Sequence, residues 1–278
     1  MTTKIFSVAE MVAAERAADA SGVSYNEMME TAGRRVAEAI VARTDINNRN
    51  VLVLVGPGNN GGDGLVVGRY LAEAGANVAF YLYKPRDAAM DTNFQLVQDL
   101  GLFIGEAQHD QRYRVLRTRL NIRDIIVDAL LGTGVTRPIE GNLAGLLKEV
   151  QSVVALRRHR LSDPDPLISI AELPETGEDV NDIPDPWVVA VDCPSGLNCD
   201  TGALDKLALA ADLTVTFAGP KSGHFRFPGS GACVELFVAD INIKNSLPEV
   251  SAGSRTLVTG EMARFLLPER PRHGHKGT

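Results

Sequence analysis

Three loops of the sequence carry most of the side chains that can do chemistry. The densest is VGPGNNGGDG at residues 55–64, in which Gly56, Gly58 and Gly61 match the G-x-G-x-x-G spacing. Between a strand and a helix, such a loop lets backbone N–H groups approach a phosphate at the helix N-terminus. It holds five glycines, two asparagines and an aspartate, more than a tight turn requires. We therefore expect it to bind a ligand, with a plain strand–helix turn as the alternative.

Asp63 argues against an ordinary dinucleotide-binding dehydrogenase. A carboxylate in the first turn of a helix would repel a pyrophosphate, whereas it suits a hydroxyl or an amine. The dehydrogenase pattern also places an acid at the end of the second strand, about 20 residues further on, where this chain reads YLYK at residues 81–84. We therefore expect a differently posed ligand. Capping of the helix by Asp63 is the alternative.

The second loop, DALLGTGVTRP at residues 128–138, follows another apolar run. Its glycines and hydroxyl groups can offer N–H groups to an anion. Arg137 can bind a phosphate through two parallel hydrogen bonds. The alternative is a glycine-rich turn in which Asp128 only caps the next helix.

The third loop, VDCPSGL at residues 191–197, holds the best candidate for acid/base catalysis. Asp192 ends a buried strand, where a partly apolar setting shifts the pKa of a carboxyl group towards a catalytic value. An Asx turn before Pro194 is the structural alternative. Ser195 lies outside any G-x-S-x-G motif, so a hydrolase nucleophile is not expected.

A fourth segment, AGPKSGH, follows an apolar run and ends at His224. Its Lys221 is a candidate to neutralise a phosphate or to tune the pKa of Asp192, and a solvated lysine is the alternative. For His224 a structural and a catalytic role are equally open.

The elements around these loops follow an alternating α/β pattern. Helices are expected from Ser7 to Gly22 and from about Ser24 to Ala42, because each starts with the Ser-x-x-Glu spacing of a capping box. The apolar run Val51–Val55 predicts a central parallel strand that is covered on both faces. Further strands are expected at 78–83, near Phe103, and at 124–130, 188–192, 213–217 and 233–238, with helices at 63–74, 91–100 and 143–155.

This alternation predicts a three-layer α/β/α sandwich, Rossmann-like, with a mostly parallel central sheet and additional N-terminal helices. The loops at the carboxyl ends of the strands should then converge at one edge of the sheet. One domain over residues 1–246 accounts for the pattern. Residues 157–186, with five prolines and eight acidic residues, are expected to form a mobile surface insertion. Residues 247–278 are expected to be a linker with a short helix at about 260–267.

Composition limits the class of protein. The 278 residues are 45% apolar, 23% charged and 5% aromatic, with a formal net charge of −7. Without a basic face, the chain is not expected to bind nucleic acid or an anionic membrane. Cys193, Cys199 and Cys233 lack a metal-ligand spacing, and the N-terminus lacks the pattern of a secretory signal. These features predict a cytoplasmic protein with reduced thiols.

Five segments together resemble the NAD(P)H-hydrate epimerase family. They are MMETAG at 28–33, GPGNNGGDG at 56–64, DALLGTG at 128–134, VDCPSGL at 191–197 and TFAGPKSGH ending at His224. The resemblance implies a homodimeric isomerase that interconverts the R and S forms of hydrated NADH and NADPH, a metabolite-repair reaction, with a bound potassium ion. The ending HKGT is similar to the start of the ADP-dependent dehydratase domain of bifunctional members, whereas residues 157–186 depart from the family pattern.

The resemblance also implies roles for single residues. The hydrated cofactor would be bound by Asn59, Asn60, Gly61, Gly62, Asp63, Gly132, Thr133, Gly134, Val135, Thr136, Arg137, Pro138 and Asp192. Potassium would be bound by Asn60, Asp128 and Ser195, an oxygen-only set that suits a hard alkali cation. Catalysis would rest on Asp192, with Lys221 beside it.

The expected chemistry follows from the position of the added hydroxyl, on a ring carbon next to the nicotinamide nitrogen. The nitrogen lone pair can help to expel it, and we expect Asp192 to protonate the departing hydroxyl and then to deprotonate water returning to the opposite face. Ring opening is an alternative route. Two other classes stay open at this point, an NAD-dependent dehydrogenase and a ligand-binding module of the same fold that has lost catalysis.

Overall fold

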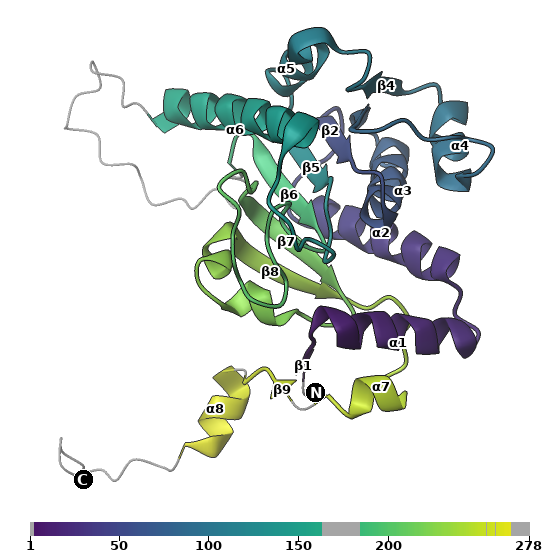
Figure 1. Cartoon of the computed structure of the whole chain (residues 1–278), viewed down its shortest axis with the longest axis vertical. Coiled ribbons are helices and arrows are strands. Elements are labelled where there is room, and N and C mark those ends of the chain that lie inside the picture. The colour runs from purple at the N-terminus through teal and green to yellow at the C-terminus, as the bar shows by residue number, and fades with distance from the viewer. Residues whose placement is uncertain (1–2, 163–183, 254, 259, 268–278) are drawn as a thin grey trace, which may run out of the picture.

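The core of the chain is one seven-stranded sheet (Figure 1). The computed structural model describes residues 3–162, 184–253, 255–258 and 260–267. The strand order is β4-β3-β2-β5-β6-β7-β8, and all neighbouring strands are parallel. In that order the strands span Phe103–Glu106, Asn77–Leu82, Asn50–Val55, Ile125–Ala129, Trp187–Val191, Ala211–Phe217 and Cys233–Ala239.

Helices cover both faces of the sheet, as predicted for a three-layer sandwich. The first two begin after Ser7 and Ser24, and each serine forms a capping box with the glutamate three residues later. One face is covered by α1 (Val8–Ala20), α2 (Tyr25–Val41), α3 (Asn59–Glu73) and α4 (Thr92–Asp99). The other face is covered by α5 (Arg114–Leu120) and α6 (Gly141–Ser162). Short 3-10 turns span Gln111–Tyr113, Ser222–Phe225 and Gly229–Ala232.

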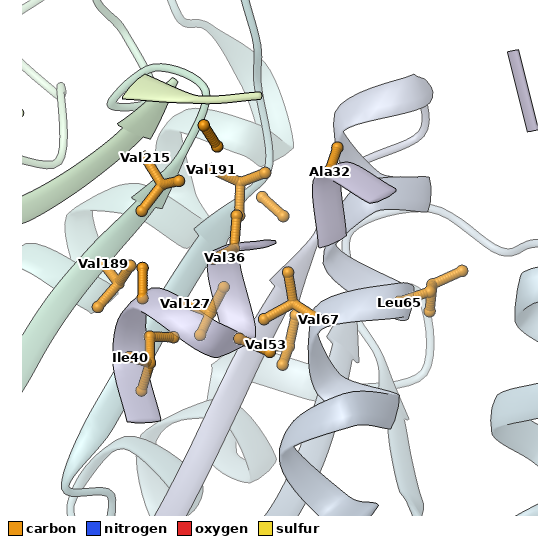
Figure 2. Close-up of a cluster of buried hydrophobic side chains, with 14 of the residues drawn as sticks. Ala32, Val36, Ile40, Val53, Leu65, Val67, Val127, Val189, Val191 and Val215 are labelled. Atoms are coloured by element: carbon orange, nitrogen blue, oxygen red, sulfur yellow. The ribbon is translucent and has the colours of Figure 1, made fainter. Parts of the chain in front are cut away.

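Each strand contributes to both layers of the core, because successive residues of a strand point to opposite faces. On β2, Val51, Val53 and Val55 pack on the side of α1 to α4, whereas Leu52 and Leu54 pack on the side of α5 and α6. Burying one such side chain stabilises the fold by roughly 1.5–3 kcal/mol. Figure 2 shows the first layer, where strand valines meet helix residues: Val53, Val127, Val189, Val215, Val36, Ile40 and Val67.

The strand order reverses between β2 and β5. From β2 the chain proceeds through β3 to β4 at the edge, and it then returns to place β5 on the other side of β2. Open α/β sheets form a crevice at the carboxyl ends of the strands at such a switch point. Because the two glycine-rich loops follow β2 and β5, the fold brings them together at this crevice.

Three helices differ from the sequence prediction. α3 begins at Asn59 rather than near Asp63. α6 continues to Ser162, so residues 157–162 are helical and do not belong to an insertion. α5 is absent from the prediction, because its sequence RVLRTRL is too short and too basic to show a clear apolar period. Residues 163–183 of the predicted insertion lie outside the described residues.

Part of the predicted linker after residue 246 folds back onto the N-terminus. β9 (Arg255–Thr256) pairs antiparallel with β1 (Lys4–Ile5). The Nζ of Lys4 donates a hydrogen bond to the carbonyl oxygen of Gly253 at 2.7 Å. These contacts attach Gly253 and β9 to the start of the chain.

Two short helices complete the described C-terminal part. α7 (Pro248–Ser251) contacts α1, and α8 (Gly260–Leu266) lies where a short helix was expected. The HKGT ending lies outside the described residues. Among those that are described, no helix has the length and apolar character needed to cross a membrane.

Candidate functional site

A cleft of about 780 Å³ opens where the three predicted loops meet. Its wall includes Asp192, the whole segment 132–138, and Asn59, Asn60 and Asp63. The structure therefore brings together the loops that follow β2, β5 and β6, as their place at one sheet edge predicts. Helix α1 contributes to the same wall through Val12 and Glu15.

Gly61 and Gly62, by contrast, are packed against protein rather than lining the cleft. A Cβ atom on Gly61 would lie 2.1 Å from the carbonyl oxygen of Gly56, and one on Gly56 would lie 1.8 Å from the carbonyl oxygen of Leu130. Only glycine allows the loop after β2 to approach the loop after β5 so closely. Close packing therefore explains part of the glycine content that suggested a phosphate-binding loop.

Asp63 lies one turn inside α3, and its carboxyl group faces the cleft. The N-cap of α3 is Gly58, and no side chain caps the helix, so the capping alternative for Asp63 is wrong. Burial raises the pKa of Asp63 well above its usual range, and the negative charges of Asp192 and Glu15 raise it further. The surroundings of the Asp63 carboxyl group therefore favour its protonated form.

Asp192 and Lys221 form a buried ion pair. Asp192 directly follows β6 with a φ of 64°, and its Oδ1 accepts hydrogen bonds from Lys221 Nζ at 2.6 Å and Thr216 Oγ1 at 2.8 Å. The Lys221 side chain is only 1% exposed, so the alternative of a solvated lysine is wrong. The Asp192 carboxylate binds these side chains rather than the backbone that follows, so the Asx turn is also not formed.

This pairing sets the charge of Asp192. Burial alone would raise the pKa of Asp192, but Lys221 and the hydrogen bond from Thr216 outweigh it and hold the pKa below its usual range. Asp192 is therefore an ionised carboxylate near neutral pH. Asp192 was predicted to act both as an acid and as a base. This environment favours the base role, in which it accepts a proton, over the acid role.

His224 lies behind this pair as a neutral imidazole. Burial and the nearby Lys221 charge lower the pKa of His224 to about 4. The Lys221 backbone N–H donates to His224 Nδ1 at 3.2 Å, so Nε2 carries the hydrogen. His224 does not line the cleft; it supports the Lys221 backbone, which favours the structural role over the catalytic one.

Asp128, Ser195 and Asn60 meet around Leu131. Asp128 accepts hydrogen bonds from Ser195 Oγ at 2.7 Å and Ser195 N at 2.8 Å. The Leu131 N–H donates to Ser195 Oγ at 2.9 Å, and Asn60 Nδ2 donates to the Leu131 carbonyl at 2.9 Å. Asp128 thus joins two loops and does not merely cap a helix.

The same three residues fit a potassium ion. Asn60 Oδ1 is buried and has no hydrogen-bond partner among the described residues. Asp128 is 0% exposed, and its hydrogen-bond donors are neutral within the described part of the chain. Burial raises the pKa of Asp128 to about 6 despite the hydrogen bonds from Ser195 and Leu130. A bound cation would offset this charge, and oxygen ligands suit a hard cation.

The cysteines differ from the prediction of reduced thiols. Cys193 and Cys199 are joined in a disulfide, so the prediction is wrong for this pair, and only Cys233 is a free thiol. Both sulfur atoms lie within 4.8 Å of a ring nitrogen of His224, and Cys193 Sγ is 3.1 Å from Nε2. Disulfide sulfur and a ring nitrogen that carries hydrogen are poor metal ligands, so this group does not form a metal site in the observed state.

The sequence prediction omits two residues of the cleft region, Thr216 and Glu15. Thr216 is one of three polar residues, with Asp212 and Thr214, that alternate with apolar ones along β7, so the sequence does not single it out. Glu15 lies one helical turn after Val12 on a helix with many charged residues, and nothing in the sequence places that helix beside the sheet edge. Burial raises the pKa of Glu15. The positive charge of Lys221 lowers this pKa, and the negative charge of Asp192 raises it further.

Comparisons with known proteins agree with this arrangement. A family model described as YjeF-related protein N-terminus matches residues 25–223. The chain is 38% identical over 259 residues to the bifunctional NAD(P)H-hydrate repair enzyme Nnr of Moorella thermoacetica, covering 90% of this chain and 42% of that protein. It is 31% identical over 241 residues to the NAD(P)H-hydrate epimerase of Limosilactobacillus fermentum, covering 86% of this chain and 98% of that protein. The chain thus spans less than half of the bifunctional relative.

A solved structure confirms the fold. The crystal structure of yeast ynu0 has a TM-score of 0.61 and 22% identity to this chain, with 83% of this chain and 84% of the yeast chain covered. The family match includes all three loops and Lys221. The chain therefore belongs to the family of YjeF-related N-terminal domains, which is that of the NAD(P)H-hydrate epimerases.

Proposed function

We propose that this chain is an NAD(P)H-hydrate epimerase domain, an isomerase that interconverts the R and S forms of hydrated NADH and NADPH. One observation carries the proposal. An ionised carboxylate, Asp192, paired with the buried Lys221, faces a cleft built from the loops after β2 and β5. A relative named for this activity is 31% identical to this chain over 241 residues.

In this proposal the Asp192 carboxylate acts on the water that returns to the ring carbon. It accepts a proton from that water as the new carbon–oxygen bond forms. Its fixed negative charge also stabilises the positively charged ring that exists once the hydroxyl has left. Lys221 is a positioning residue, because it holds Asp192 ionised and oriented. The departing hydroxyl needs a proton from another group.

The proposed cofactor contacts are the predicted residues that line the cleft. Asn59 and Asn60 lie at the N-terminus of α3, and segment 132–138 forms another part of the wall. Arg137 is exposed within that segment and is available to bind a phosphate of the cofactor. Asp63 and Asp192 face the same cleft and are placed for the reacting ring.

We also propose that Asn60, Asp128 and Ser195 hold a potassium ion. When bound, the ion would supply positive charge that offsets the buried Asp128 carboxylate. The protein side chains already fix the loops that it would join, since Asp128 binds Ser195 and Asn60 binds the Leu131 carbonyl. By binding oxygen atoms from both loops at once, a cation would hold these loops together more firmly and make the cleft wall more rigid.

We propose two further contacts, one with a second copy of the chain and one with another domain, from exposed apolar side chains and from the relatives. Phe227 is 86% exposed and Val234, on the edge strand β8, is 75% exposed, which supports a homodimer contact there. On α8, Phe265 is 90% exposed, which supports contact with a further domain such as the dehydratase domain of a bifunctional enzyme. Because its proposed substrates are soluble cofactors, a cytoplasmic location is proposed as well.

The test is chromatography of the two epimers of hydrated NADH. A sample enriched in one epimer is incubated with wild-type protein, with Asp192→Asn, or without protein. Faster equilibration by the wild type alone supports the proposal. Equal rates in all three samples, with and without potassium, would leave a binding module as the better account. An absorbance scan with an added alcohol tests the dehydrogenase alternative, which predicts hydride transfer.

A further inference from the structure

Three carboxyl groups from different elements face the cleft. Glu15 comes from α1, Asp63 from α3 and Asp192 from the loop after β6. Neither Glu15 nor Asp63 has a part in the proton transfer described so far. Three acids around one small cleft cannot all be charged without a matching set of cations.

The basic groups nearest to these acids are already used. Lys221 Nζ donates to Asp192 Oδ1, to Thr216 Oγ1 at 2.8 Å and to the Phe217 carbonyl at 3.3 Å. An ammonium group has three hydrogens, so none is left for a second carboxylate.

Arg86, on the loop after β3, is committed in the same way. Its guanidinium pairs with Asp91 and donates to the carbonyl oxygens of Gly56 at 2.8 Å and Gly58 at 2.7 Å. Within the described residues, the carboxyl groups of Asp63 and Glu15 have no hydrogen-bond or ion-pair partner.

The charged groups that face Asp63 come from four elements. Asp192 and Glu15 oppose its ionisation, and the more weakly acting Arg86 and Lys221 favour it. Burial adds to the effect of the two acids and is the largest contribution. Of the three acids in the cleft, Asp192 is therefore paired with a cation of the protein, whereas Asp63 and Glu15 are not.

We infer that Asp63 is a second catalytic residue, the general acid that protonates the departing hydroxyl, and that Glu15 is a positioning residue whose charge keeps Asp63 protonated. The inference rests on the proposed epimerase function. It divides between two carboxyl groups the acid and base roles that the sequence suggested for Asp192 alone. Groups whose surroundings push their proton affinities apart are suited to such a division.

The proton balance of one inversion is complete with these two groups. The Asp63 proton moves to the hydroxyl oxygen, the carbon–oxygen bond breaks, and the ring nitrogen lone pair forms a double bond to the ring carbon. Water then adds to the opposite face of that carbon, and its proton moves to the Asp192 carboxylate. The two acids have exchanged protonation states, which is the arrangement needed for the reverse inversion, and exchange with solvent restores the first state.

The first test is Asp63→Asn, which keeps the shape and removes the proton. We expect kcat for epimerisation to fall roughly 10²–10⁴-fold, with KM within a few-fold of the wild type. Asp99→Asn, an exposed aspartate at the end of α4, is the matched control and should keep wild-type kcat. A near-normal kcat for Asp63→Asn, or a loss confined to KM, would overturn the inference.

The second test is the pH profile of Glu15→Gln. Removing the Glu15 charge makes Asp63 easier to ionise, so the decline of kcat on the alkaline side should move to lower pH. If the decline of kcat at high pH stays at the wild-type pH, the inference is overturned. This test remains decisive even if Asp63→Asn fails to fold. If the wild type itself does not speed equilibration, the proposed function fails; an active wild type with an active Asp63→Asn overturns only the inference.

Discussion

Asp128 lies on β5 and Asp192 directly follows the neighbouring parallel strand β6, yet their charges are offset in different ways. Asp192 pairs with the buried ammonium group of Lys221. Asp128 receives hydrogen bonds only from neutral groups, those of Ser195 and Leu130, among the described residues. Accordingly, the pKa of Asp192 lies below its usual range, whereas burial raises the pKa of Asp128 to about 6.

This difference in neighbouring charge suits the two carboxylates to two different tasks, proton acceptance and cation binding. A carboxylate that is ionised by its own protein can accept a proton in every turnover, whatever the ions in solution. A buried carboxylate without a protein cation is instead suited to bind a cation from solution. In the proposed function, the same residue type would serve proton transfer after β6 and cation binding on β5, and the neighbouring positive charge would decide which.

The largest expected effect is that of Asp192→Asn on turnover. The amide can still accept the hydrogen bonds of Lys221 and Thr216 but cannot take up a proton from water. We expect epimerisation to slow roughly 10²–10⁴-fold while the circular dichroism spectrum stays that of the wild type. Turnover within a few-fold of the wild type would remove Asp192 from the base role.

Lys221→Met should have the next largest effect, on stability. It leaves the buried Asp192 carboxylate without its cation, and breaking a buried ion pair in this way typically costs about 3–5 kcal/mol. Urea unfolding at neutral pH measures the free energy of unfolding. The double variant Lys221→Met with Asp192→Asn should recover much of the loss, because no buried charge remains. A single variant as stable as the wild type would contradict a structural dependence of Asp192 on Lys221.

Potassium should stabilise the wild type through the Asp128 site. At a potassium concentration of about 100 times the dissociation constant, binding adds roughly 2.7 kcal/mol to the free energy of unfolding. The rise in Tm over a choline chloride control should vanish in Asp128→Asn and persist in Asp192→Asn. If potassium stabilises Asp128→Asn as much as the wild type, the ion binds elsewhere.

The smallest expected effect concerns His224 and pH. Its pKa is about 4 in the folded protein against 6.5 for an unperturbed histidine. Because the unfolded chain binds this proton first, His224 lowers stability as pH falls through 6.5 towards 4. Relative to His224→Asn, the wild type should lose about 2 kcal/mol of unfolding free energy between pH 7 and pH 5. A difference independent of pH would show that folding does not lower the pKa of His224.

Much of this fold was predictable, because strands such as β2 and β6 contain continuous apolar runs and the first two helices start with capping boxes. The three loops could be located for the same reason, since each directly follows such a run. Their convergence follows from parallel strands having their carboxyl ends at one edge. The sheet order and the switch point between β2 and β5 depend on packing between distant segments, and no local pattern contains them.

The chemistry of the site was less predictable than its position. Asp192 and Lys221 pair because β6 and β7 are neighbours, so the ionised state of Asp192 emerges only in three dimensions. Glu15 joins the cleft only because α1 packs beside the sheet edge. Some glycines, such as Gly56, are explained by close contact with the loop after β5. A phosphate-binding motif in the sequence does not distinguish such packing glycines from glycines that contact a ligand.

The most direct measurement of the central claim is epimerisation of an enriched sample of hydrated NADH in heavy-oxygen water, followed by chromatography and mass spectrometry. If the chain removes the hydroxyl and returns water to the opposite face, wild-type protein should speed equilibration, and each inverted molecule should carry the heavy isotope. Acceleration without label would point to ring opening with the original oxygen retained. No acceleration over the sample without protein would contradict the epimerase assignment itself.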